Sequence, residues 1–431
     1  MTDQGVVRLL ETAMQAQREG RAAQAEVLLL RALEAGPDEP VVLNSLGVHW
    51  LAEGRARDAQ PLFERAVSID TQAPPLWMNL AKACRLQGDD AGERRALDAV
   101  LAIDQRDLMA LVRMAELHER RGEPALAAQR WAGVIAVGQQ ISPRNADLQK
   151  LLDHASAFVA DRMAAFGSVI DDWRWPAVAD ADPLVRRRFN AAMDAVLGRR
   201  RIFANQCVGL HYPFLPADEF FDRSHFPWMA GLEAQTPALR AEAEHALTGG
   251  LKGFEPYIAM ERGLPENLWS GLDHSMDWSA LHLWRYGERN HALCDRFPAI
   301  TAAIEALPLA QMPRRAPTVF LSVLRPGARI PPHTGVSNAR TIIHLPLIVP
   351  DGCSFRVGGE TRPWRVGEAF AFDDTIEHEA INPTDQPRVV LIFDVWNPHL
   401  TQAERELLIG YFDTADASGH NPGLAAAVSD D

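Results

Sequence analysis

The sequence predicts an α+β protein of several domains, with an array of helical repeats in its first third and a β-rich domain towards its C-terminus. Two observations carry this prediction. Gly20, Gly54, Gly88 and Gly122 recur at a constant spacing, with apolar residues at helical spacing before and after each one. After Pro317 the chain changes to short runs rich in β-branched and aromatic residues, which glycine and proline separate. Because 431 residues are too many for one compact core, we expect separate domains.

The composition is that of a folded protein, and it excludes several function classes. Hydrophobic residues make up 47% of the chain and charged residues 23%, far from the profile of a disordered chain. The formal net charge of −14, without a basic stripe, argues against a nucleic-acid partner. The four cysteines lie far apart without a CxxC pair, which argues against a structural zinc site and a disulfide framework. The chain shows neither a secretion signal nor a membrane-spanning stretch, so we expect a cytoplasmic protein.

The repeat in the first third indicates stacked helical hairpins. When the chain is aligned on its recurring glycines, small residues coincide at Gly47, Ala81 and Ala115, and larger ones at Phe63, Leu97 and Trp131. Small residues let two helices approach closely while large residues fill the space between them. The pattern resembles tetratricopeptide repeats and defines a first domain at residues 1–141. The resemblance implies an α-helical solenoid with a concave surface for a peptide or protein partner. An arm for packing or for forming a homo-oligomer is the alternative.

Two further boundaries follow from changes of pattern. Residues 142–201 keep helical spacing but lose the repeat, so we interpret them as a helical connector. A passage rich in proline and aromatic residues around Leu210–Pro216 marks the start of the β-rich domain, which we place at residues 202–412. The strand-like run Trp278–Gly287 lies within it and could form a wall of a substrate pocket. Residues 413–431 are rich in Ala, Gly, Ser and Asp, and we expect them to be disordered.

Two histidines in the β-rich domain are candidate metal ligands. His333 lies in a proline-containing turn after one predicted strand, and His378 lies just past another. Neutral imidazoles suit Fe(II), and a site with two protein ligands leaves positions open for a chelating cosubstrate, water and oxygen. A single histidine in a β domain is more often a satisfied polar group, so only the pair favours a metal site.

Three polar residues interrupt apolar strands nearby. Ser322 shares a strand face with apolar neighbours, His344 interrupts the run Ile342–Val349, and Arg388 points the same way as the apolar residues that follow it. Burying such groups without partners would be costly. A guanidinium beside a barrel interior needs an anion, and a carboxylate is its natural match. The alternative for Arg388 is a salt bridge at a strand end.

These residues together carry a family resemblance. The segment from Ser322 to Trp396 resembles the catalytic core of the aspartyl/asparaginyl β-hydroxylase family of 2-oxoglutarate oxygenases. The matching pieces are His333-Thr334-Gly335, Asn338-Ala339-Arg340, His344-Leu345-Pro346-Leu347, Phe372-Asp373-Asp374, Glu377-His378-Glu379 and Phe393-Asp394-Val395-Trp396.

The resemblance implies a double-stranded β-helix, a cupin-like jelly roll, that uses Fe(II), 2-oxoglutarate and O2. It also implies a role for each matching residue. His333 and His378 would bind iron, Ser322, His344 and Arg388 would hold 2-oxoglutarate, and Asp374 would hold an iron-bound water. Arg340 would meet a substrate carboxylate. The usual oxygenase pattern has an acidic residue where this chain has Gly335, and this family likewise lacks it. Ile342 stands where family members place a second arginine, which argues against an acidic peptide substrate.

The predicted function is a hydroxylase that acts on an aspartyl or asparaginyl side chain of a peptide or protein. One alternative is the same chemistry on a small molecule, such as an amino acid, a lipid or a peptide natural product. A second is a catalytically inactive repeat scaffold. A third is a zinc-dependent hydrolase, which would need a third protein ligand and a general base.

Overall fold

The computed structural model describes residues 3–419, and the chain divides into two compact units, Met1–Asp180 and Ala181–Asp431. Each unit is described by itself. None of the helices within residues 3–419 is long and apolar enough to span a membrane.

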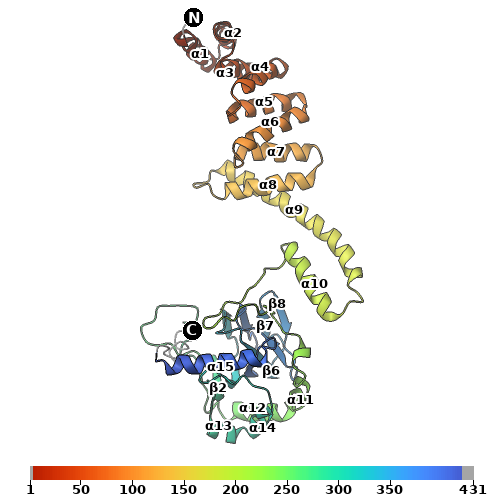
Figure 1. Ribbon diagram of the computed structural model, residues 1–431, viewed down its shortest axis with the longest axis vertical. Helices are drawn as coiled ribbons and strands as arrows, with labels where there is room; N and C mark the ends of the chain where they lie inside the picture. The colour runs from red at the N-terminus through yellow and green to blue at the C-terminus, as the bar shows by residue number, and fades with distance from the viewer. Residues whose placement is uncertain (1–2, 420–431) are drawn as a thin grey trace. The chain divides into compact units, whose positions relative to one another are not determined.

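The first unit contains four consecutive helical hairpins (Figure 1). Their helices are α1 (Asp3–Arg18), α2 (Ala22–Ala35), α3 (Pro40–Ala52), α4 (Ala56–Ile69), α5 (Pro74–Gln87), α6 (Asp90–Ile103), α7 (Leu108–Arg120) and α8 (Pro124–Gly138). The recurring glycines Gly20, Gly54, Gly88 and Gly122 each lie after the first helix of a hairpin. All four have positive φ angles between 67° and 76°, which glycine adopts without the steric cost that other residues incur. The hairpins confirm the predicted helical repeat.

Close helix contact explains the small residues of the repeat. A Cβ atom added at Gly47 would lie 2.7 Å from the Phe63 ring, so the two helices of this hairpin can pack together only because residue 47 has no side chain. Phe63, Leu97 and Trp131 are almost fully buried, as expected for residues that fill the space between helices. Helix α9 (Ala146–Ala177) continues the stack, because its residues Leu152 and Ala155 pack in one apolar cluster with Trp131.

Two antiparallel β-sheets form the centre of the second unit. The larger sheet has the strand order β1-β2-β4-β11-β6-β9, with β3 paired to β2, and the smaller has the order β5-β10-β7-β8. The strands are β1 (Glu255–Pro256), β2 (Trp278–Arg285), β3 (Glu288–Arg289), β4 (Val319–Leu324), β5 (Arg329–His333), β6 (Arg340–Ile348), β7 (Ser354–Val357), β8 (Glu360–Pro363), β9 (Phe370–Phe372), β10 (His378–Ile381) and β11 (Arg388–Trp396). From β4 onwards the chain passes repeatedly from one sheet to the other, so both sheets contribute residues to the space between them.

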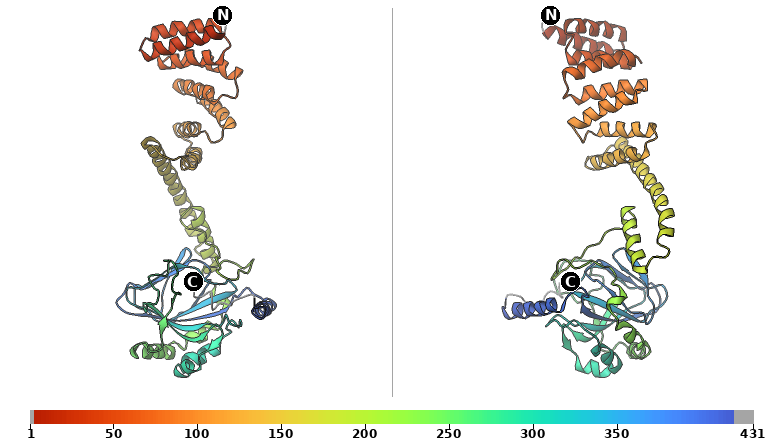
Figure 2. Two further views of the ribbon diagram at one scale, coloured as in Figure 1. Left: turned by 90° about the vertical axis from the view of Figure 1, so that its left-hand side faces the viewer. Right: turned by 45° about the vertical axis from the view of Figure 1, so that its right-hand side comes forward.

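A layer of four helices covers one face of the larger sheet in the second unit. The helices of this unit are α10 (Pro183–Val196), α11 (Met229–Glu233), α12 (Thr236–Thr248), α13 (His291–Arg296), α14 (Pro298–Glu305) and α15 (Gln402–Ala417), and α11–α14 form the layer. Apolar residues of this face, including Leu321, Leu345 and Leu391, pack against Leu239 of α12 and Ile300 of α14. Figure 2 shows this layer of helices beside the sheets. The other face is therefore free to carry polar groups.

Helix α15 corrects the prediction that the C-terminal segment from residue 413 is disordered. The helix continues to Ala417, because Phe412 is buried and the buried carboxylate of Asp416 forms ion pairs with Arg314 and Arg315. A Thr401–Glu404 capping box fixes its first turn. Residues 420–431 of the predicted tail lie outside the described residues.

Candidate functional site

A cavity of about 230 Å³ opens on the polar face of the larger sheet. Its lining residues come from both sheets and include all seven site residues predicted from the sequence: Ser322, His333, Arg340, His344, Asp374, His378 and Arg388. The strand period explains this convergence. Residues two apart on β4, β6 and β11 point to the same face, and the register pairs Ser322 with Val390 and His344 with Ile392 across the sheet.

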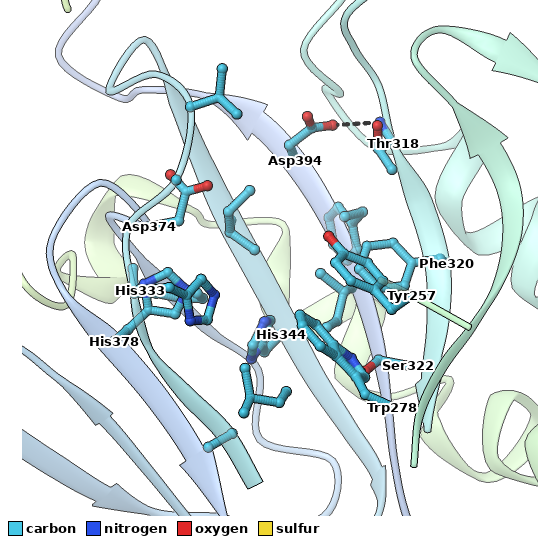
Figure 3. Close-up of a pocket in the computed structure, with 18 of the residues that line it drawn as sticks. Tyr257, Trp278, Thr318, Phe320, Ser322, His333, His344, Asp374, His378 and Asp394 are labelled. Carbon is cyan, nitrogen blue, oxygen red and sulfur yellow. Dashed lines mark hydrogen bonds between the residues drawn. The ribbon is translucent and has the colours of Figure 1, made fainter. Parts of the chain in front are cut away.

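His333 and His378 lie next to each other in this cavity (Figure 3). His333 ends β5, His378 begins β10, and the two residues are direct partners in the antiparallel pair. Their ring centroids are 4.0 Å apart. Such a pair of side chains on adjacent strands of a rigid sheet is positioned before any ligand arrives.

Backbone contacts set the protonation of both rings. The Nδ1 atom of His333 is 2.8 Å from the carbonyl oxygen of Pro331, and that of His378 is 3.0 Å from the carbonyl oxygen of Ile376. A carbonyl only accepts, so each Nδ1 donates and each Nε2 keeps its lone pair. Burial lowers the pKa of His333 to about 4 and also lowers the pKa of His378. Both rings are therefore neutral at physiological pH, as metal ligands must be.

Asp374 lies beside the two histidines and fills the space that a side chain at residue 335 would need. A Cβ atom added at Gly335 would overlap the Asp374 carboxylate, and the Gly335 amide donates to the Asp374 carbonyl oxygen at 2.6 Å. Oδ1 of Asp374 is buried without a hydrogen-bond partner. Burial raises the pKa of Asp374 to about 7, although Arg340 opposes this shift. Within residues 3–419 no group of three or more His, Cys, Asp and Glu residues could hold a metal ion, so a metal ion at this place would have only the two histidines as protein ligands.

Arg388 is a buried cation without an anionic partner among residues 3–419. Its side chain is 1% exposed, its Nε atom has no hydrogen-bond partner, and Nη2 donates to Ser322 Oγ at 3.2 Å. No carboxylate of residues 3–419 forms an ion pair with it, which rules out the salt-bridge alternative for this part of the chain. Burial accordingly lowers the pKa of Arg388 to about 10. Since an unpaired buried charge is costly, this end of the cavity is suited to an anionic ligand.

His344, Trp278 and Trp364 complete the surroundings of Arg388. The Trp278 Nε1 atom donates to Ser322 Oγ at 3.2 Å, and the Trp364 ring lies 5.2 Å from the Arg388 guanidinium. His344 stacks on Trp364 and is buried, with no partner at Nδ1. Its pKa is lowered by burial and by the nearby charge of Arg388, so it is neutral. Trp364 could not be predicted as a site residue, because it lies in a short loop after β8.

These features fit Fe(II) and 2-oxoglutarate. Two neutral imidazoles with free Nε2 atoms suit an iron ion, and two protein ligands leave positions for a chelating cosubstrate. The orphaned guanidinium of Arg388, with the hydroxyl of Ser322, suits the distal carboxylate of that cosubstrate.

Arg340 and the opposite wall form the rest of the cavity. Arg340 Nη1 donates to Asp394 Oδ2 within the protein, and Asp394 Oδ1 accepts from the Thr318 amide at 2.8 Å. Tyr257 stacks on Trp278 with ring centroids 3.9 Å apart, opposite the histidines. Trp278 and His282 line the cavity, as the strand-like run around them suggested. Tyr257 was not foreseen, because it directly follows the two-residue strand β1, which has no recognisable pattern.

Comparisons with known proteins agree with this site. The model of the aspartyl/asparaginyl β-hydroxylase family matches residues 233–398. The chain is 37% identical to the human aspartyl/asparaginyl β-hydroxylase over 146 residues, 34% of this chain and 19% of the human protein. It is 30% identical to the ornithine lipid ester-linked acyl 2-hydroxylase of Rhizobium tropici over 218 residues, 48% of this chain and 73% of that protein.

The extent of these matches differs between relatives. The chain spans about a fifth of the length of the human and mouse β-hydroxylases. Among solved structures, the MamA protein covers 42% of this chain at 17% identity and a TM-score of 0.30, so the repeat assignment rests on the helices themselves. The chain covers most of the bacterial lipid hydroxylase, and the segment that the family model matches contains the cavity and its two histidines. The chain belongs to the aspartyl/asparaginyl β-hydroxylase family.

Proposed function

We propose that the chain is an Fe(II)- and 2-oxoglutarate-dependent oxygenase that hydroxylates an unactivated carbon, on a double-stranded β-helix formed by β4–β11. The observation that carries this proposal is the buried, unpaired Arg388 in the same cavity as two adjacent neutral histidines. A cavity that contains both a metal-ligand pair and a carboxylate-binding cation suits a metal-chelating dicarboxylate. Neither the zinc hydrolase nor the inactive scaffold accounts for Arg388, and the hydrolase also lacks a third ligand among residues 3–419.

Each residue has one role in this proposal. His333 and His378 present Nε2 to the iron, and their backbone hydrogen bonds fix the orientation of the rings. Arg388 and Ser322 bind the distal carboxylate of 2-oxoglutarate, while His344 faces the same ligand as a neutral hydrogen-bonding group. Asp374 holds a water at the metal. Iron and 2-oxoglutarate, when bound, supply the oxidant that removes hydrogen from carbon.

Two classes of substrate fit this chemistry. The name of the human relative suggests an aspartyl or asparaginyl side chain, and the name of the Rhizobium tropici relative suggests an acyl group of a lipid. The helical repeats favour a peptide or protein substrate, since such arrays offer extended binding surfaces.

The test is oxygen-dependent formation of succinate from 2-oxoglutarate. Protein loaded with Fe(II) under anaerobic conditions is mixed with 2-oxoglutarate, and succinate is measured after oxygen is admitted. We expect succinate from the wild type and from His245→Ala, an exposed histidine on α12 that serves as the control. His333→Ala should form none, and Arg388→Ala should form succinate only at much higher 2-oxoglutarate. Failure of the wild type to form succinate or to bind 2-oxoglutarate would overturn the proposal.

A further inference from the structure

We call the part of the cavity at Arg388 and Ser322 the cosubstrate end. Next to it lies a part lined by Tyr257, Phe320, Arg340, Ile342 and Asp394. We call these five residues the substrate half. In Figure 3, Tyr257 and Phe320 lie on the wall opposite His333 and His378, and Asp394 lies at one end of the cavity beside Thr318. A molecule held between this wall and the histidines would present its carbon atoms to the metal site.

The one cation in the substrate half is neutralised by the protein. Arg340 Nη1 donates to the carboxylate of Asp394, and Asp394 is only 1% exposed. Asp394 is held in place by the Thr318 amide, and it occupies the position opposite Ile342 in the β6–β11 register. The Arg340–Asp394 pair is therefore part of the cavity wall in the ligand-free protein. The Arg340 charge is compensated before any substrate binds.

Among residues 3–419, the cavity lining offers no other cation to a substrate carboxylate. Arginine supplies every permanent positive charge of the cavity lining, at Arg285, Arg340 and Arg388. Arg285 is half-exposed and pairs with Glu255 at 3.0 Å, and Arg388 belongs to the cosubstrate end. The carboxyl group of Asp374 lies in the same cavity, and whether it is ionised or protonated it supplies no positive charge. A carboxylate placed here would lose its hydration without gaining an ion pair.

The remaining surface of the substrate half is apolar. Arg340, Ile342 and His344 occupy alternate positions of β6 and point to the same face, so an isoleucine stands between the two polar residues. Across the cavity Phe320 is 5% exposed, and its ring lies 5.4 Å from that of Tyr257. Aliphatic carbon packs well against such a wall.

We propose that the substrate half selects an uncharged group over a carboxylate, and that Asp394 sets this preference by neutralising Arg340. The inference rests on the proposed oxygenase function and narrows its substrate class. The reacting segment is an uncharged carbon chain, as in an asparaginyl side chain or an acyl group. An aspartate side chain is disfavoured, and so is the role of Arg340 as a partner of a substrate carboxylate.

Fluorine NMR with matched probes tests the preference in the full-length protein. The protein is loaded with Zn²⁺ and saturated with 2-oxoglutarate, so that no turnover occurs. Binding of trifluorobutyramide is then compared with binding of trifluorobutyrate, a probe of nearly the same shape that carries a negative charge. N-acetylasparagine methylamide and N-acetylaspartate methylamide, used as competitors, distinguish a peptide side chain from an acyl chain as the natural source.

The wild type should bind the neutral member of each pair at least about tenfold more tightly, because the acid would remain as an unpaired charge. Ile342→Arg adds a free cation beside Arg340 and should reverse the preference, whereas Ile342→Leu should keep it. Asp394→Asn removes the carboxylate that neutralises Arg340 and should also shift the preference towards the acid. This second variant keeps the test decisive if Ile342→Arg does not fold.

Equal or tighter binding of the acid by the wild type would overturn the inference. Absence of binding by any probe would overturn it as well, because the cavity would then not accept an uncharged group of this size. Succinate formation, measured on the same preparations with Fe(II), separates the two proposals. If succinate forms while the acid is preferred, only the substrate class is wrong. If no succinate forms, the proposed function fails whatever the probes show.

Discussion

Replacing Arg388 with methionine should stabilise the ligand-free protein while greatly weakening 2-oxoglutarate binding. Burial lowers the pKa of Arg388 from 12.5 to about 10, a difference that corresponds to a cost of about 3 kcal/mol for keeping the charge inside the folded protein. Methionine removes this cost. It also loses the hydrogen bond to Ser322, worth about 1 kcal/mol, and the contact with the Trp364 ring, worth about 1 kcal/mol. The net gain in unfolding free energy is therefore about 1 kcal/mol.

Differential scanning calorimetry measures this gain. The transition of the second unit should rise by about 2–4 °C in Arg388→Met. The matched control is Arg315→Met, which removes a buried arginine that has a carboxylate partner, Asp416, and which should lower the same transition. A second measurement adds Mn²⁺ and 2-oxoglutarate without oxygen, with 2-oxoglutarate at about a hundred times its dissociation constant for the wild type. The unfolding free energy of the wild type should then rise by about 2.7 kcal/mol, and that of Arg388→Met should not rise.

Two results would refute this reasoning. If the unfolding free energy of ligand-free Arg388→Met were lower than that of the wild type by more than about 2 kcal/mol, the guanidinium would stabilise the fold as a member of a satisfied buried polar network. If 2-oxoglutarate stabilised the variant as much as it stabilises the wild type, the cosubstrate would bind elsewhere.

Three further predictions concern other parts of the chain. Gly335→Ala should displace the Asp374 carboxylate and, like Asp374→Ala, weaken metal binding about 10–100-fold in a calorimetric titration; unchanged affinity in both would argue against a role for this carboxylate. Gly47→Ala should lower the transition of the first unit by overlap with Phe63 and leave succinate formation unchanged, and an unaltered transition would contradict the packing described. The hydrogen bond from Arg315 lowers the pKa of the Asp416 carboxyl. The stability that this carboxylate contributes is therefore fully present above its unfolded-state pKa of about 4 and is lost as the pH falls through its folded-state pKa. Acid unfolding of Asp416→Asn should lack this contribution, and identical pH profiles of the variant and the wild type would contradict it.

The sequence alone predicted the parts of the site that depend on strand periodicity. Ser322 and His344 interrupt apolar runs on strands with a period of two, and the structure brings both into the cavity. The recurring glycines predicted the helical hairpins in the same way, because a positive φ angle is a local requirement.

Pairing between distant residues could not be predicted in this way. The neutralisation of Arg340 by Asp394 depends on the register of β6 and β11, which no local pattern of either strand specifies. The contact of Trp364 with Arg388 depends on where the loop after β8 places the Trp364 ring, which no pattern of that loop specifies. The predicted disorder after residue 412 was wrong for α15, because composition does not reveal that Phe412 packs on the sheet domain or that Asp416 has arginine partners.

The most direct test of the central claim follows the fate of oxygen. Fe(II)-loaded protein and 2-oxoglutarate are exposed to isotopically labelled O2, and the succinate formed is analysed by mass spectrometry. The proposed chemistry predicts one labelled oxygen atom in each succinate, with no succinate from His378→Ala. Unlabelled succinate, or labelled succinate that forms equally in His378→Ala, would contradict the assignment of this cavity as an oxygenase active site.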